Sequence, residues 1–138
     1  MSTDYNFTHC YVNAKFVNPQ MAQKAIEGFN KAVADWNDEA YECGDNCVGA
    51  VAELDTDDKD KTLVRVYVPN DIDDYPCDIY AMAKLICTYF PNADGEISEA
   101  WACVSAGGYT RSCGGRSLTI KKGVTYEQTP KLVKVKNW

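Results

Sequence analysis

The chain has 138 residues, of which 46% are hydrophobic and 25% are charged, and its formal net charge is −6. This length is that of a single domain, which we place over residues 1–138, and the composition is ordinary for a globular protein. No apolar run approaches the ~20 residues that span a bilayer, and residues 1–10 carry no signal-peptide pattern. We therefore expect a soluble, cytoplasmic protein.

The seven cysteines are an odd number without a signal peptide, which predicts reduced thiols rather than a disulfide scaffold. Cys43 and Cys47 have three residues between them, a spacing that zinc sites tolerate. Cys103 and Cys113 would have to complete such a site, but nine residues separate them and no second ligand pair is visible. We expect no metal and no cofactor.

Charge is distributed unevenly along the chain. Residues 35–78 hold fourteen Asp or Glu against three Lys or Arg, a net charge of −11, whereas residues 105–138 carry a net charge of +6. An acidic surface repels nucleic acid and attracts basic protein surfaces. The middle of the chain is therefore the first candidate for a partner-binding surface.

The N-terminal part of the chain predicts a strand followed by a helix. Apolar and polar residues alternate over residues 6–17, as expected of a half-buried strand. Asn18 and Pro19 favour a helix start, and an apolar stripe at spacings of three and four predicts a helix over 19–37. Residues 37–46 predict a polar, acidic loop.

The central part predicts a hairpin and a second helix. The alternating segments 47–54 and 61–69 are joined by the short polar stretch 55–60, which favours an antiparallel pair. Residues 73–76, with two aspartates and an early proline, predict a helix start with acidic caps. The apolar stripe of this helix runs over residues 79–90.

The C-terminal part predicts a second hairpin. Residues 96–105 and 116–122 are its expected strands, and the glycine-rich stretch 106–115 is expected to be a flexible connection. Residues 123–138 predict either a last edge strand or a flexible basic tail. The order is β-α-β-β-α-β plus an extra strand, which predicts an α+β, ferredoxin-like two-layer sandwich.

In that fold, the loop after the first helix and the segment before the second helix lie at the same end of the sheet. Their acidic side chains would converge into one pole, and we predict that this pole binds a partner. Solubility and helix capping would account for the same acids equally well. The pole comprises Asp35, Asp38, Glu39, Glu42, Asp45, Asp71, Asp73 and Asp74.

The sheet face away from the helices is the alternative binding surface. His9, Tyr11, Arg65 and Tyr67 are expected there on neighbouring strands, as aromatic residues are in RNA-recognition domains. The likeness is one of architecture only, because the glycine and aromatic pattern of those domains is absent from residues 63–68. A simpler expectation is that the C-terminal segment or a second copy of the chain covers this face, giving a homodimer.

No catalytic constellation is visible in the sequence. His9 is the only histidine, and nothing places it beside a reactive thiol. The clustered carboxylates could in principle do acid–base chemistry, but the sequence indicates no substrate for it. We therefore predict a binding protein rather than an enzyme.

In size and charge the chain is similar to small acidic inhibitors from phages and mobile elements, including anti-CRISPR proteins, although no motif connects it to one of their families. The resemblance implies an inhibitor or adaptor that docks an anionic surface on a basic, nucleic-acid-handling protein of a host cytoplasm. The competing hypothesis is a single-stranded nucleic-acid-binding module that uses the aromatic sheet face.

Overall fold

The computed structural model describes residues 3–44, 46–69, 72–73, 77–105, 107 and 110–127. They form an antiparallel sheet and two helices, which confirms the predicted α+β class. Along the chain the elements are β1 (Thr3–Lys15), α1 (Pro19–Cys43), β2 (Val51–Leu54), β3 (Leu63–Tyr67), β4 (Ile72–Asp73), α2 (Ile79–Tyr89), β5 (Asp94–Val104), β6 (Thr110–Lys121) and β7 (Val124–Glu127).

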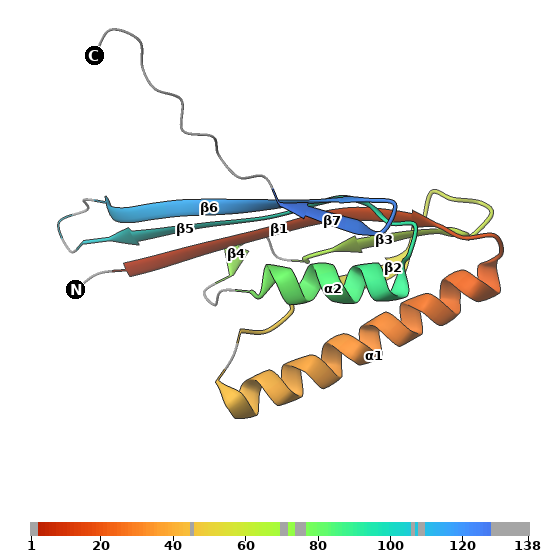
Figure 1. The fold of residues 1–138 in the computed structure, drawn as a ribbon, viewed down its shortest axis with the longest axis horizontal. Coiled ribbons are helices and arrows are strands. Elements are labelled where there is room, and N and C mark those ends of the chain that lie inside the picture. Colours follow the sequence, from red (N-terminus) through yellow and green to blue (C-terminus); the bar gives the residue numbers. More distant parts are fainter. Residues whose placement is uncertain are drawn as a thin grey trace, which may run out of the picture.

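Within the described residues the sheet has seven strands, six of them in the order β2-β3-β1-β5-β6-β7 (Figure 1). All neighbouring strands are antiparallel, and the short β4 pairs with β1 outside this order. The ferredoxin-like arrangement is not established, because the strand count and the full strand order differ from the expected unit. The two hairpins predicted from the sequence, β2–β3 and β5–β6, are both present.

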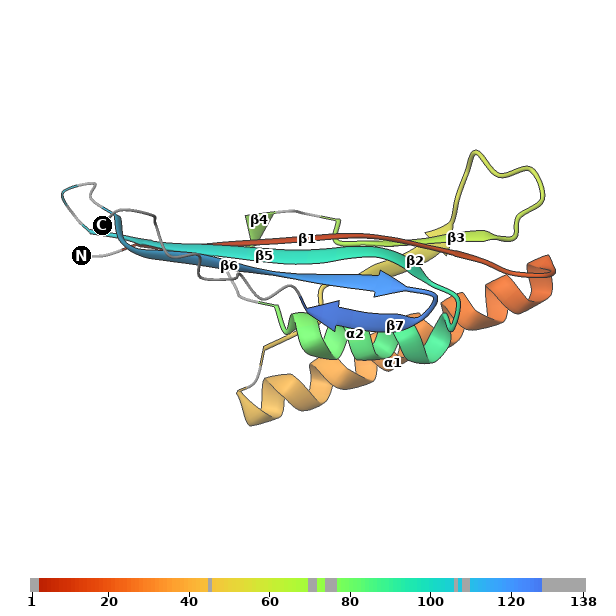
Figure 2. The ribbon, with the colours of Figure 1, turned by 45° about the horizontal axis from the view of Figure 1, so that its top comes forward.

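Both helices lie on the same face of the sheet (Figure 2), and the core fills the space between the two layers. The alternation of apolar residues along the strands explains this core, because every second side chain of a strand points to the helices. Cys10, Val12 and Ala14 of β1 are buried, as predicted, and Val64 and Val66 of β3 lie beside them. β1, β5 and β6 extend past the N-terminal end of α2 (Figure 1).

Helix α1 is longer than predicted, and the acidic loop expected over 37–46 is wrong for residues 37–43. The apolar stripe continues one step further than we expected, because Ala40 is 3% exposed and lies seven residues after the buried Val33. The helix ends at Gly44, whose φ of 75° is the left-handed conformation that glycine adopts at helix ends. Ala40 and Gly44 were the sequence signals for this longer helix.

Helix α2 begins later than predicted. Its N-cap is Asp78, whose side chain accepts a hydrogen bond from the Ala81 backbone N–H at 3.0 Å. Asp73 instead lies in β4, where it pairs with Asn6, so the prediction that Asp73 caps this helix is wrong. The part of that prediction that concerns Asp74 lies outside the described residues. The predicted stripe over 79–90 is confirmed, with Met82, Ile86 and Phe90 among its fully buried side chains.

Strand β6 begins earlier than predicted, at Thr110, so residues 110–115 are not part of a flexible connection. Gly114 lies within the strand, opposite Trp101 of β5. A Cβ atom at position 114 would overlap the indole ring of Trp101, so glycine here allows close packing across the hairpin. β7 provides the predicted extra strand over four residues, and the remainder of that prediction, residues 128–138, lies outside the described residues.

Candidate partner-binding surfaces

Four of the predicted acidic residues lie on one exposed face at the C-terminal end of α1. Asp35, Asp38, Glu39 and Glu42 are spaced by three, four and seven residues, which places them on a common helical surface. All four are exposed. We call this surface the α1 acidic face. It lies at the opposite end of the molecule from the loop that joins β2 to β3 (Figure 1).

One member of the α1 acidic face, Glu42, opposes the dipole of its own helix. The C-terminal end of a helix carries partial negative charge, which favours basic side chains and disfavours acidic ones. The last turn of α1 holds no basic residue, and Glu42 lies within it. The arrangement is therefore locally unfavourable, which helix capping or helix stability cannot explain.

The other half of the predicted acidic pole is not described. Asp45, Asp71 and Asp74 lie outside the described residues, and Asp73 is placed by its backbone in β4. Convergence of the two acidic clusters therefore stays a prediction.

Two asparagines fix α1 to the edge strand β2 and to the segment before it. The Asn37 side chain accepts the backbone N–H of Val48 at 2.7 Å and donates to its carbonyl at 2.9 Å. Asn30, two turns earlier, makes the same pair of hydrogen bonds with Ala52, both at 3.1 Å. Asn37 lies between the acids of the α1 acidic face in sequence, so it holds their helical segment against the protein.

On the open sheet face, Arg65 and Tyr67 are engaged by a carboxylate. Arg65 forms an ion pair with Glu53 at 2.5 Å, and the Tyr67 hydroxyl donates to the same carboxylate at 3.0 Å. These hydrogen bonds hold the pKa of Glu53 below its usual value and raise that of Tyr67. The Arg65 guanidinium also lies 5.0 Å from the centre of the Tyr67 ring. Sequence reasoning had placed Arg65 and Tyr67 here without their partner, Glu53.

The remaining sheet-face candidates lie on β1. Tyr11 is directly opposite Tyr67 in the register and is 64% exposed. His9 is exposed and pairs with Ser98 of β5. The structure thus brings Tyr11 and Tyr67 onto neighbouring strands, and the Glu53 carboxylate contacts Tyr67 and Arg65.

Sequence reasoning missed a second aromatic group, on the helix-side face where the sheet extends past α2. Arg116 of β6 lies over the rings of Tyr80 and Trp101, at 6.0 Å and 5.7 Å from their centres, and 3.8 Å from Glu99. Tyr80 and Trp101 are 45% and 37% exposed. Only the glycine at position 114, which makes room for the indole, could have signalled this group in the sequence.

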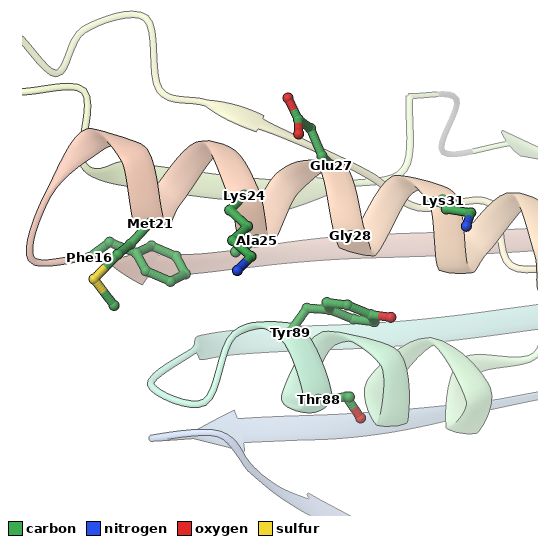
Figure 3. Close-up of a pocket in the computed structure, with 9 residues that line it drawn as sticks. All are labelled: Phe16, Met21, Lys24, Ala25, Glu27, Gly28, Lys31, Thr88 and Tyr89. Carbon is green, nitrogen blue, oxygen red and sulfur yellow. The ribbon is translucent and has the colours of Figure 1, made fainter.

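An open groove runs between the two helices (Figure 3) and has a volume of about 630 Å³. Its floor is apolar and includes Phe16 and Tyr89, and Glu27 points away from it (Figure 3). The Thr88 hydroxyl at its edge already donates to the Lys84 carbonyl at 2.7 Å. The groove offers apolar contact and no group poised for chemistry.

The described cysteines form no cluster that points to a metal. Cys43 and Cys47 are exposed, and Cys47 makes an isolated β-bridge with Cys77. Among residues with described positions, no three His, Cys, Asp or Glu side chains are grouped to hold an ion. Burial raises the pKa of the Cys10 thiol to about 12, which removes it as a nucleophile at neutral pH.

Comparisons with protein-family models, with curated proteins and with solved structures find no match to this chain. In the part of the chain that the structure describes, no helix is long and apolar enough to cross a membrane.

Proposed function

We propose that the protein is a non-enzymatic interaction protein that docks an anionic surface on a basic partner. The α1 acidic face is the centre of this surface. The partner would be a protein that handles nucleic acid, whose basic site the acids occupy in place of phosphates. Inhibition or adaptor activity follows from that occupancy, as in phage or mobile-element proteins of the anti-CRISPR type acting in a host cytoplasm.

The observation that carries the proposal is the conflict between the α1 acidic face and the helix dipole. Acids that served only solubility could stand anywhere on the surface at no cost. Glu42, in the last turn of α1, costs roughly 0.3–1 kcal/mol relative to a basic residue there, and the dipole acts little on the three acids before it. Local rules are broken most often at functional sites, where binding outweighs stability. Asp38 and Glu42 lie one turn apart near the helix end, and both are exposed.

The strand order β2-β3-β1-β5 supports a finer description of the fold. Within it, β1 and β2 run parallel with β3 between them, and β3 and β5 run parallel with β1 between them. We propose that this part is a ferredoxin-like split β-α-β unit, extended at one edge by β6 and β7. In that description the α1 acidic face lies at the end of the first crossover helix.

The single-stranded nucleic-acid-binding module is the second candidate, and one observation favours it. Tyr11 and Tyr67 lie opposite each other on neighbouring strands, where two bases could stack. Against it, Glu53 neutralises Arg65 and would repel phosphates approaching the same face. The acidic-docking proposal is therefore the better supported of the two.

The test is capture of a partner from lysate of the source cells, with nuclease present, followed by mass spectrometry. The double variant Asp38→Lys/Glu42→Lys should lose the captured protein. It should also be slightly more stable to urea, because the lysine at position 42 lies in the last helical turn, where the dipole favours a positive charge. Loss of binding together with gained stability separates a functional surface from a misfolded one.

The matched control is Asp57→Lys/Asp60→Lys, which makes the same charge change in the exposed loop between β2 and β3. This control should keep the partner. Equal capture by all three proteins would disprove the docking role of the α1 acidic face. Recovery of oligonucleotides without nuclease, lost in Tyr11→Ala, would instead support the nucleic-acid-binding module.

A further inference from the structure

Strand β6 has a long outer edge that pairs with no described strand. On its inner side it pairs with β5 over nearly its whole length. On its outer side it pairs with β7 only over residues 118–121. Residues 110–117 therefore present backbone donors and acceptors to whatever lies beyond the described sheet.

The turn between β6 and β7 fixes which residues donate outward. Lys122 and Gly123 both have positive φ angles, 49° and 75°, as in the two-residue type I′ turn. Such a turn makes Lys121 and Val124 a hydrogen-bonded pair, and hydrogen-bonded pairs then alternate along the ladder. By this alternation Gly115 and Cys113 direct their N–H and carbonyl groups to the outer edge.

Continuation of the same chain would cover this edge poorly. In the β6–β7 register, Pro130 would fall opposite Gly115, where the ladder requires an N–H that proline lacks. Residues 128–138 also carry three lysines and no acid, so they match the charge of β6 rather than complement it.

Charge favours an acidic occupant over a second copy of the chain. β6 contains Arg111, Arg116 and Lys121 and no acidic residue, in a protein whose net charge is −6. Antiparallel pairing of two β6 edges would bring arginine-bearing strands together, which like charges oppose. An extended segment with carboxylates would instead be attracted to the basic residues of β6.

The helix-side surface beside this edge is built to contact side chains of an added strand. The Trp101 indole lies over Gly114, so a residue paired with Gly114 would place its side chain against the ring. Arg116 follows two residues later on the same face, held beside Tyr80 and Trp101 and 3.8 Å from the Glu99 carboxylate, with half of its side chain still exposed to a further carboxylate. A strand here would meet an apolar surface and a guanidinium at adjacent positions of one face.

We propose that the outer edge of β6 binds an extended acidic segment of a partner protein by strand addition. The segment carries a carboxylate opposite Arg116 and an apolar side chain opposite Gly114, two residues apart. Backbone hydrogen bonds supply most of the affinity, and these two side chains supply the specificity. The site is separate from the α1 acidic face and does not depend on the function proposed for it.

The experiment measures binding of labelled octapeptides to the full chain by fluorescence anisotropy. The probe alternates threonine with glutamate or valine, so that glutamate and valine lie on one face two residues apart. A second peptide replaces glutamate with lysine, and a third is N-methylated at alternate residues. The acidic peptide should bind at least about tenfold more tightly than the lysine peptide, and the N-methylated peptide should not bind.

The variants Cys113→Pro and Cys113→Ser provide the matched pair. Proline removes an outward N–H while leaving the ladder to β5 intact, so Cys113→Pro should weaken binding at least about tenfold and Cys113→Ser should not. Equal binding by both variants would overturn the proposal, as would no binding of the acidic peptide to the native chain. So would strong hydrogen-exchange protection of the outward amides of Cys113 and Gly115 in the free protein, which would mean that the chain's own tail or a second copy already covers the edge. The proposal would also be overturned if an oligonucleotide bound both the native chain and Cys113→Pro while the peptides bound neither.

Discussion

Asn37 on α1 holds the backbone of Val48 from both sides, accepting its N–H and donating to its carbonyl. The segment that leads into the edge strand β2 therefore has backbone hydrogen bonds supplied by a helix rather than by another strand. Because Asn37 is flanked by acids of the α1 acidic face, the same contact positions that face.

We expect Asn37→Ala to lower the free energy of unfolding by about 1–3 kcal/mol, because the N–H and carbonyl of the fully buried Val48 lose their partner. Urea denaturation measures the effect. Asn30→Ala, which removes the equivalent contact with Ala52, should cost a similar amount. The exposed neighbour Asp38→Ala is the control and should change stability by less than about 0.5 kcal/mol. An unchanged midpoint for Asn37→Ala would show that this contact does not hold α1.

A second prediction concerns Gly28 on α1 and the Tyr89 ring of α2. A Cβ atom at position 28 would lie 2.8 Å from Cε1 of Tyr89, so the ring would have to move. We expect Gly28→Ala to destabilise the protein by roughly 1–3 kcal/mol through overpacking, despite the better helix propensity of alanine.

The control for Gly28→Ala is the same substitution in a Tyr89→Leu background. Once the ring is gone, helix propensity alone should act, and alanine should become stabilising by up to about 1 kcal/mol. Thermal or urea unfolding of the native protein, the two single variants and the double variant shows whether Gly28→Ala stabilises or destabilises each background. A destabilising effect of equal size in both backgrounds would exclude contact with Tyr89 as its cause.

The sequence predicted those features that depend on periodicity. The buried alternation of β1 and the stripe of α2 follow from side-chain direction alone, so local pattern is sufficient for them. The end of α1 was mispredicted because the residues after Trp36 are mostly polar. Only Ala40 among them continues the apolar stripe of the helix. Polarity there reflects an exposed helical face and the Asn37 contact, and that contact depends on a strand that comes later in the chain.

The partner-binding surfaces were less predictable than the fold. The exposure of four α1 acids follows from helical spacing, but the opposition to the helix dipole depended on knowing where the helix ends. The group around Arg116 needs the β5–β6 register, which brings Trp101 beside Gly114. Such cross-strand contacts cannot be predicted from one segment at a time. In addition, the pair Gly114-Gly115 resembles a turn in the sequence although it lies within a strand.

A third prediction concerns acid stability through Glu53. Hydrogen bonds from Arg65 and Tyr67 lower the pKa of this carboxyl from its ordinary value of 4.5. Near its ordinary pKa, the Glu53 carboxyl binds a proton more readily in the unfolded chain than in the folded one. The stabilising contribution of Glu53 is therefore lost as the pH falls through its folded-state pKa. Stability of the native protein and of Glu53→Gln should therefore differ at pH 7 and converge in acid. A difference that stayed constant from pH 7 to acid would contradict this linkage.

A fourth prediction concerns Cys10, whose burial raises the thiol pKa from 9.0 to about 12. Between these values the unfolded chain loses the thiol proton and the folded chain keeps it, so unfolding releases a proton and stability falls as pH rises above 9. At pH 8, a thiol reagent should modify the exposed Cys43, Cys47 and Cys113 quickly and Cys10 only as fast as the protein opens. Mass spectrometry of digested, labelled protein separates these sites. Labelling of Cys10 at the rate of the exposed thiols would mean that β1 does not hold it in the core, and the buried face assigned to that strand would have to be revised.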